Sequence, residues 1–407
     1  MTRRFCFYSG YRDLKGGYTT LLLTLITELR NQEQEVVLIN YHNGLIEKEL
    51  ALDNIKITIL DLDAIIWKDI HQKIFSTDIF IITAFDEIYR HIISINPVII
   101  FYDINDFISG ISDYKFGIKF PSLGRKLIRQ LQTNRSLWFM DDTGMFNLAN
   151  DFDLQIEKPV FVPIPVIVPR GNSYMNRKSH SAEALQLTYI GRSVDWKMKP
   201  LKKILSDIVE VKSLKEILFT VVVDDARAMK EMIELDRFGG VSNFTLKIME
   251  NLNPSDINEF LMQYSDLHFA MGTAALDAAK LGIPTIVMDY SPKELPGDYT
   301  YSWLFEVKDF SLGKNLLKRS ALPGLSMKEL LDKVNSDPLF IPQVSSLSHD
   351  YVLKAHDVKN IVNEIIKLST KAGFRLKEAS KYIPYYFRAH RLIKAIAGAL
   401  YSNKSTR

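Results

Sequence analysis

The chain has 407 residues, of which 47% are hydrophobic and 24% are charged. This is ordinary composition for a globular protein with roughly two or three hydrophobic cores, and it excludes a chain that is mainly disordered. Lys and Arg number 51 against 48 Asp and Glu, so the formal net charge is +3. That charge is far too small for a protein whose whole surface follows nucleic-acid phosphates, so we expect no nucleic-acid partner.

The single cysteine, Cys6, can neither form an internal disulfide nor supply a Cys-rich zinc site. A reducing compartment fits this usage best. The first residues lead straight into an apolar strand-like run without a signal-type segment, and no run of about 18 uncharged apolar residues follows. We therefore expect a cytoplasmic protein without a membrane span.

Short apolar runs alternate with amphipathic stretches of helical length in the first part of the chain. A strand is expected over 5–8, a helix over 21–30 and a strand over 36–40, which together form a βαβ unit. Further apolar runs follow at 57–60, 79–83, 98–102, 137–140 and 160–162. Strands this apolar are buried on both faces, so a parallel sheet covered by helices is expected.

A second alternation follows a segment rich in proline and polar residues. Three prolines and a polar run occupy residues 163–181, which is typical of a linker. Strands are then expected at 187–190, 218–223, 244–248, 267–269 and 285–289. Two doubly wound α/β domains explain this pattern most simply. We expect an N-terminal domain over 1–165, a linker over 166–183, a C-terminal domain over 184–370 and a tail over 371–407.

The first candidate site lies between the first strand and the first helix. Gly16 and Gly17 precede a helix expected from Tyr18. Adjacent glycines let the backbone approach a ligand, and the N–H groups at a helix N-terminus attract phosphate. The spacing is not the dinucleotide fingerprint, which argues against NAD. A tight turn without a ligand is the alternative.

The second candidate site closes the first strand of the second domain. Gly191 and Arg192 end that strand, and Lys197 follows five positions later. Two cations on a loop at the carboxyl end of a strand can neutralise a diphosphate without a metal. They can equally be solvated surface cations, because Lys199, Lys202 and Lys203 make the neighbourhood generally basic.

The third candidate site opens a helix rich in small residues. Gly272 and Thr273 begin that helix, and Asp277 lies one turn further on. A carboxylate at this position can accept hydrogen bonds from both hydroxyls of a ribose. A helix-terminal charge without a ligand is the alternative for Asp277. The run ends in Gly282 and Pro284, which punctuate a helix and the strand after it.

In this order, the three segments resemble GT-B glycosyltransferases, most closely family 4, which builds bacterial surface polysaccharides. Residues 15–17 look like the family's first-domain glycine loop. Residues 190–192 with Lys197 are similar to its Gly-Arg…Lys motif, whose cations bind the donor diphosphate. Asp277 stands where the second acid of the two-glutamate motif holds the ribose. The resemblance implies two Rossmann-like domains that face each other across a cleft, with a C-terminal helix returning to the first.

The chain departs from the family pattern at two places. Phe269 stands where the first glutamate of the motif is expected near the donor sugar. The glycine-rich end of the second strand of the C-terminal domain is replaced by Asp224 and Asp225. These changes leave open whether the reaction retains or inverts the anomeric configuration.

An inverting reaction requires a general base that deprotonates the acceptor hydroxyl. Asp103, at the end of the strand over 98–102, is our candidate, with Asp141 and Asp142 as rivals. Aspartates at strand ends are also common turn formers. We expect His268 to contact the donor sugar. The histidine spacing suits no metal site, and we expect none.

The tail concentrates positive charge. Residues 371–407 contain five Lys and four Arg against Glu378 alone, and 382–401 interleave them with Tyr385, Tyr386 and Phe387. We expect residues 381–407 to contact an anionic membrane surface. A docked amphipathic helix with a solvated basic face is the alternative.

The sequence thus predicts a metal-independent hexosyltransferase. Its donor is expected to be a UDP- or GDP-linked sugar, with no further cofactor. Its acceptor is expected to be a glycan, lipid-linked at the inner face of the cytoplasmic membrane, in surface polysaccharide synthesis such as lipopolysaccharide or capsule. The alternatives are a sugar-nucleotide 2-epimerase of the same fold and a catalytically silent scaffold protein. A homodimer stays open.

Overall fold

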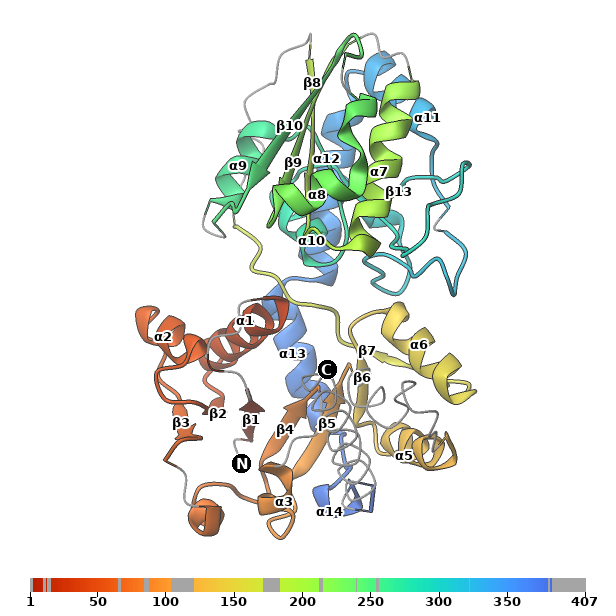
Figure 1. The fold of residues 1–407 in the computed structure, drawn as a ribbon. Helices are drawn as coiled ribbons and strands as arrows, with labels where there is room; N and C mark the ends of the chain where they lie inside the picture. The colour runs from red at the N-terminus through yellow and green to blue at the C-terminus, as the bar shows by residue number, and fades with distance from the viewer. Residues whose placement is uncertain are drawn as a thin grey trace, which may run out of the picture. The chain divides into compact units, whose positions relative to one another are not determined.

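The computed structural model describes the chain except residues 1–2, 10–11, 13–15, 65–66, 84–87, 104–120, 171–183, 212–214, 239, 254–255, 322, 380 and 383–407. Most of the tail predicted to contact a membrane therefore lies outside the described residues. The chain divides into two compact units, which we call unit 1 (residues 1–165 and 358–407) and unit 2 (residues 166–357). Each is built on its own sheet (Figure 1).

The described strands of unit 1 form one parallel sheet in the order β3-β2-β1-β4-β5-β6-β7. The strand order runs away from β1 and β4 in opposite directions, so the topological switch point lies between these two strands. The expected apolar runs are all found as strands. Their bounds are β1 Arg4–Tyr8, β2 Glu35–Asn40, β3 Thr58–Asp61, β4 Ile79–Ile82, β5 Val98–Tyr102, β6 Leu137–Phe139 and β7 Val160–Phe161.

Helices cover both faces of this sheet, and each face has its own hydrophobic core. Cys6 belongs to one core, whereas its neighbours Phe5 and Phe7 belong to the other, because successive strand residues point to opposite faces. The helices are α1 Gly17–Asn31, α2 Leu45–Leu52, α3 Ile88–Ile92, α5 Pro121–Thr133, α6 Asp142–Phe152, α13 Val358–Ser369 and α14 Leu376–Ala379, with a 3₁₀ turn η1 Trp67–Gln72.

The chain returns to unit 1 earlier than the sequence predicts. Residues 358–370 were expected in the second domain, but α13 packs against α1 and buries Val358, Ile361 and Ile365 in the unit 1 core. The chain beyond α13 stays there. The Ile99 N–H donates to the Phe374 carbonyl (2.9 Å), and the Phe374 N–H donates to Ser136 Oγ (3.2 Å). The return of a C-terminal helix to the first domain is confirmed.

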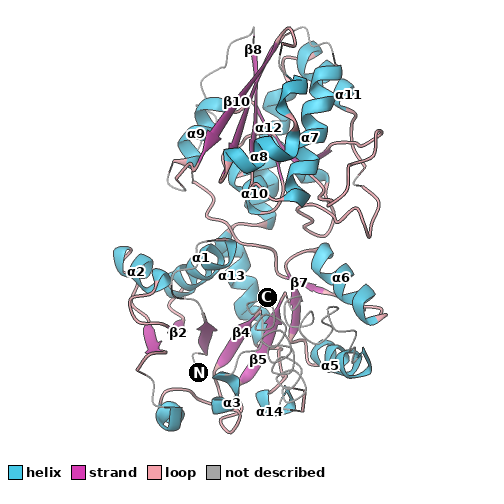
Figure 2. Ribbon diagram, viewed as in Figure 1, coloured by secondary structure: helices cyan, strands magenta, loops and turns pink. Residues whose placement is uncertain are grey.

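The described strands of unit 2 form one sheet in the order β10-β9-β8-β11-β12-β13, parallel except for β13. Helices flank it on both sides (Figure 2). The strands are β8 Ala184–Ile190, β9 Glu216–Val223, β10 Phe244–Glu250, β11 Leu267–Ala270, β12 Thr285–Val287 and β13 Ser302–Trp303. The helices are α7 Asp195–Glu210, α8 Ala226–Ile233, α9 Ile257–Tyr264, α10 Thr273–Ala279, α11 Met327–Ser336 and α12 Phe340–Ala355, with 3₁₀ turns η4 Leu235–Phe238 and η5 Leu304–Glu306.

The predicted α/β class with two doubly wound units is therefore confirmed. Within the part of the chain that the structure describes, no helix is both long enough and apolar enough to cross a membrane.

The docking of the C-terminal segment generates a test. Phe374 is fully buried in the unit 1 core, so Phe374→Ala should lower the free energy of unfolding by about 3–5 kcal/mol. Urea denaturation followed by intrinsic fluorescence measures the loss. Lys371→Ala, at an exposed position three residues earlier, is the control and should change stability by less than about 0.5 kcal/mol. Equal stability of the two variants would contradict this packing.

Candidate functional site

The sheet of unit 2 has its topological switch point at β8. This strand lies between β9 and β11, although β11 follows β10 in the chain. Ligands of doubly wound domains bind outside the carboxyl ends of the strands at such a point. Gly191 and Arg192 follow β8, and Gly272 follows β11 after a single residue. The structure thus brings two of the three sequence motifs to the same edge of the same sheet.

Gly191 lets the chain turn closely over a buried ring. A Cβ atom at this residue would lie 2.7 Å from Tyr189 Oη and 2.8 Å from the nearest Tyr189 ring carbon. Tyr189 is fully buried, and its hydroxyl donates to the Lys197 carbonyl at 3.3 Å. The Gly191 N–H donates to the Val222 carbonyl at 3.1 Å. The end of β8, the end of β9 and the first turn of α7 are therefore held together, and the glycine is required sterically.

Arg192 lies close enough to Lys197 for its positive charge to act on the lysine. Arg192 is exposed and Lys197 is half-buried in the first turn of α7. Burial, and then the neighbouring Arg192 charge, lower the pKa of Lys197 to about 8, while Asp224 acts in the opposite direction. A partly buried lysine beside a second cation gains stability when an anion binds next to both of them. The two cations can therefore attract an anionic group at this edge of the sheet.

Asp224 is part of the same cluster. The Ser193 N–H donates to Asp224 Oδ1 at 2.6 Å, and Ser193 Oγ donates to the Asp225 carbonyl at 2.7 Å. Burial alone would raise the pKa of Asp224, but the hydrogen bonds from Ser193 and the Arg192 charge lower it overall. An ionised, anchored carboxylate therefore lies beside the two cations. Part of their charge is already balanced before any ligand binds.

Gly272 adopts a backbone conformation that favours glycine, with a φ of 67°, and no atom lies within 4 Å of a Cβ built on it. Its N–H donates to the Leu312 carbonyl at 2.9 Å. This amide is therefore occupied within the protein and is not free to donate to a ligand. Open space above the glycine and the exposed Thr273 remain at the edge of the sheet.

Asp277 lies one turn into α10 and is one-third exposed. Its Oδ1 accepts a hydrogen bond from Lys280 Nζ at 2.6 Å. No other described residue donates a hydrogen bond to this carboxylate. Asp277 is therefore an ion-paired carboxylate with a second oxygen that can accept a ribose hydroxyl, and its expected role remains a prediction.

The structure corrects the expectation for His268. Its ring is fully buried, and Nδ1 lies 2.8 Å from Thr188 Oγ1, which in turn lies 2.6 Å from Ser265 Oγ. Burial lowers the pKa of His268 to about 3, so the ring is neutral. A side chain enclosed in this way cannot contact a donor sugar without rearrangement of β11.

Phe269 points to the other face of β11 and packs edge-on against Phe219 and Tyr301 in the unit 2 core. The position at which the family carries its first glutamate is therefore a core position in this chain. A carboxylate at the same residue would be buried among apolar side chains.

The glycine loop of unit 1 is described in part. Gly16 is the N-cap residue of α1 with a φ of 154°, and α1 begins at Gly17. No atom lies within 4 Å of a Cβ built on either glycine. Arg12 is anchored by an ion pair with Asp63, and its carbonyl accepts from the Leu45 N–H at 2.8 Å. The loop follows β1, so it lies at the switch point of the unit 1 sheet.

The candidate general bases also lie in unit 1, whereas Arg192 belongs to unit 2. Asp103 ends β5 with a φ of 57°, and its N–H donates to the Trp138 carbonyl at 3.1 Å. Asp141 caps α6 by accepting from the Gly144 N–H at 2.8 Å, and Asp142 is buried. Capping gives Asp141 a structural role, and the choice of Asp103 as the general base stays a prediction.

Two features of the unit 2 site were missed at the sequence level. Ser193 joins the ends of β8 and β9, and the rings of Trp196 and Tyr290 pack edge to face with centroids 5.4 Å apart beside Lys197. The adjacency of Trp196 to Lys197 was the available signal. Among the residues that the structure describes, no group of three His, Cys, Asp or Glu side chains could hold a metal ion.

Comparison with solved structures agrees with this topology. A glycosyltransferase from Rickettsia africae has a TM-score of 0.59 at 11% identity, covering 90% of this chain and 97% of that one. HepE from Anabaena, in complex with UDP and glucose, has a TM-score of 0.53 at 11% identity, covering 90% and 99%. A variant of TarM from S. aureus, in complex with Fondaparinux, α-GlcNAc-glycerol and UDP, has a TM-score of 0.53 at 10% identity, covering 90% and 99%.

The chain has the GT-B fold. No protein-family model matches the sequence, and no curated protein matches it. At sequence identities of 10–11%, these structures show the fold of this chain but not its activity or its ligands. The resemblance to family 4 therefore stays a prediction.

The burial of His268 generates a pH prediction. Its folded pKa of about 3 lies below the ordinary 6.5, so the unfolded chain binds a proton that the folded chain does not. The stability contributed by the neutral ring is present above the ordinary pKa and is lost as pH falls towards the folded pKa. Between about pH 7 and pH 5, wild type should lose about 2 kcal/mol more unfolding free energy than His268→Gln. Urea denaturation at both pH values measures this, and parallel losses would contradict a buried neutral ring.

Proposed function

We propose that the chain is a glycosyltransferase that binds a nucleotide-diphosphate sugar at the carboxyl ends of β8 and β11. The observation that carries this proposal is the pair Arg192 and Lys197 at the switch point of unit 2, with the pKa of Lys197 lowered to about 8. Structures with the same fold include HepE, whose complex holds UDP and glucose, and a complex of TarM that holds UDP. A diphosphate matches both the charge and the position of the two cations.

In the proposed reaction, an acceptor hydroxyl oxygen forms a bond to the anomeric carbon, and the bond from that carbon to the β-phosphate oxygen breaks. The leaving nucleoside diphosphate gains negative charge as that bond breaks. Arg192 and Lys197 stabilise this charge more strongly in the transition state than in the bound donor. They do so without a metal. Asp277 holds the ribose, and Thr273 offers a hydroxyl to phosphate.

The acceptor in this proposal is a glycan, lipid-linked at the inner face of the cytoplasmic membrane. Residues 381–407 supply the basic, aromatic segment that contacts anionic lipid. If the reaction inverts, Asp103 takes the proton of the acceptor hydroxyl. Transfer of a hexosyl group in surface polysaccharide synthesis follows from the family resemblance.

A catalytically silent protein with the same fold is the second candidate. Two observations favour it. Phe269 is buried in the core where the family has an acid near the sugar, and Asp224 already balances part of the positive charge. Binding of a nucleotide without turnover of any sugar nucleotide would support this candidate over the enzyme.

The donor site is tested by calorimetric titration of UDP and GDP without added metal. Removing one charge-assisted phosphate contact should cost on the order of 2 kcal/mol, so Arg192→Ala should weaken binding roughly 30-fold. Lys199→Ala is the matched control, because Lys199 lies on the same helix but pairs with Glu294 at 2.9 Å. Its affinity should stay within about twofold of wild type.

Repeating the nucleotide titration at pH values above the pKa of Lys197 tests the role of this lysine independently. Lys197 binds phosphate in its protonated form, so affinity should fall as pH rises through about 8. Equal affinity of wild type and Arg192→Ala for every nucleotide that binds would contradict the proposed site.

A further inference from the structure

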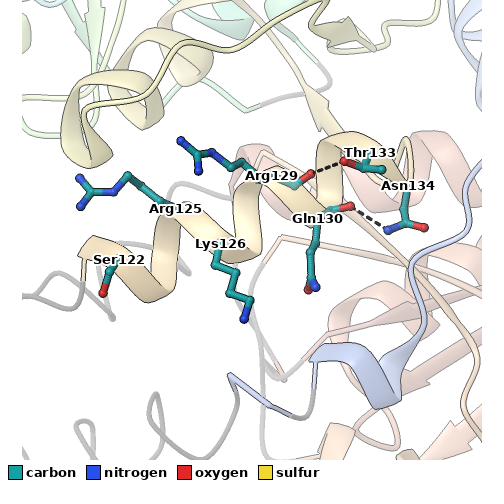
Figure 3. A pocket seen from close by; sticks show the side chains of 7 residues that line it. All are labelled: Ser122, Arg125, Lys126, Arg129, Gln130, Thr133 and Asn134. Atoms are coloured by element: carbon teal, nitrogen blue, oxygen red, sulfur yellow. Dashed lines mark hydrogen bonds between the residues drawn. The ribbon is translucent and has the colours of Figure 1, made fainter.

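Helix α5 of unit 1 carries a cationic face that the donor site does not explain. The face borders a surface hollow of about 620 Å³. The described residues that line the hollow all belong to α5 or follow it directly, and none of them is acidic (Figure 3). They are Ser122, Arg125, Lys126, Arg129, Gln130, Thr133 and Asn134.

The three cations of this face lack carboxylate partners among the described residues. No Asp or Glu oxygen of the described residues lies within 4.0 Å of the charged nitrogens of Arg125, Lys126 or Arg129. The lysines of α7 differ, because Lys199 pairs with Glu294 and Lys203 with Asp207. Within the described part of the chain, no carboxylate therefore offsets the positive charge of α5.

The spacing of these cations is unfavourable for the helix itself. Arg125 and Arg129 stand four residues apart and extend to the same side of α5 in Figure 3. Like charges at this spacing destabilise a helix by about 0.2–0.5 kcal/mol. The hydrophobic packing of α5 does not need them, because α5 is attached to unit 1 by its opposite face, where Leu127, Ile128 and Leu131 are fully buried.

Neighbouring contacts hold the polar face in position. A Cβ atom on Gly124 would lie 1.9 Å from the Phe152 ring, so only glycine allows α5 to pack this closely on α6. Arg125 then donates to the Phe152 carbonyl at 3.2 Å. The Tyr382 hydroxyl donates to Gln130 Oε1 at 2.8 Å, which directs the Gln130 amide nitrogen as a donor. Pre-positioned donors lower the entropy lost when a ligand binds.

We propose that this face of α5 binds an anionic glycan, as the acidic part of the acceptor. This assignment of a substrate class rests on the proposed transferase function. The cations attract carboxylate, sulfate or phosphate groups, and the interleaved amide and hydroxyl side chains hydrogen-bond sugar hydroxyls. Residues 122–134 span about 18 Å along the helix, which suits an extended chain better than a single ion. Binding of a lipid surface would require only the positive charges of this face. It would not require the hollow or the amide side chains.

The test compares two double variants of the full chain with equal net charge. Lys126→Gln with Arg129→Gln removes two charges from the face. Lys328→Gln with Lys367→Gln removes two exposed charges that have carboxylate partners elsewhere. The probes are a sulfated heparin oligosaccharide, a neutral maltopentaose, and phosphatidylcholine vesicles with and without phosphatidylglycerol. UDP is titrated into each variant in parallel to report the integrity of the donor site.

The sulfated oligosaccharide should bind wild type and the control variant equally, and should bind the α5 variant about tenfold more weakly. Maltopentaose should bind much more weakly than the sulfated probe. Equal binding of the sulfated probe by both variants would overturn the inference, as would loss of vesicle binding in the α5 variant without any oligosaccharide binding. If UDP binds while the sulfated probe does not, this inference alone fails. If neither binds, the proposed function fails with it.

Discussion

The parallel pairing of β8 with β11 is the constraint on which the rest of unit 2 depends. These strands are not consecutive in the chain, and the register sets His268 opposite Thr188 and Phe269 opposite Tyr189. It thereby fixes two features at once. The strands end at the same edge, so Arg192 and Thr273 lie at the switch point. Successive residues of β11 point into separate buried layers, so neither His268 nor Phe269 reaches that edge.

The electrostatics of that edge follow from burial as much as from charge. The hydroxyl of Tyr189 donates a hydrogen bond to the Lys197 carbonyl. Burial, together with the nearby Arg192 charge, lowers the pKa of Lys197 to about 8. Asp224, anchored by Ser193, opposes both cations. An anion that binds here gains from two cations and is repelled by one fixed carboxylate, so affinity is a difference between these terms.

The sequence predicted the sheet strands well because strands buried on both faces leave uninterrupted apolar runs. It could not assign α13 to the correct unit. The amphipathic pattern of Val358–Ser369 indicates that one face of the helix is buried, but not which sheet that face covers. His268 was misjudged for a related reason. Its place near the end of a strand suggested access to the donor site, whereas a doubly covered sheet buries both His268 and Phe269. The occupied amide of Gly272 depends on Leu312, forty residues away, which no local pattern reveals.

Hydrogen–deuterium exchange of the full protein with and without UDP tests the central claim most directly, because it locates the ligand without a substitution. A nucleotide diphosphate bound at the β8–β11 edge should slow exchange in peptides covering residues 191–198 and 271–276, while peptides from α11 and α12 on other parts of unit 2 should be unchanged. Binding of UDP that leaves both peptides unchanged would contradict the assignment of the donor site.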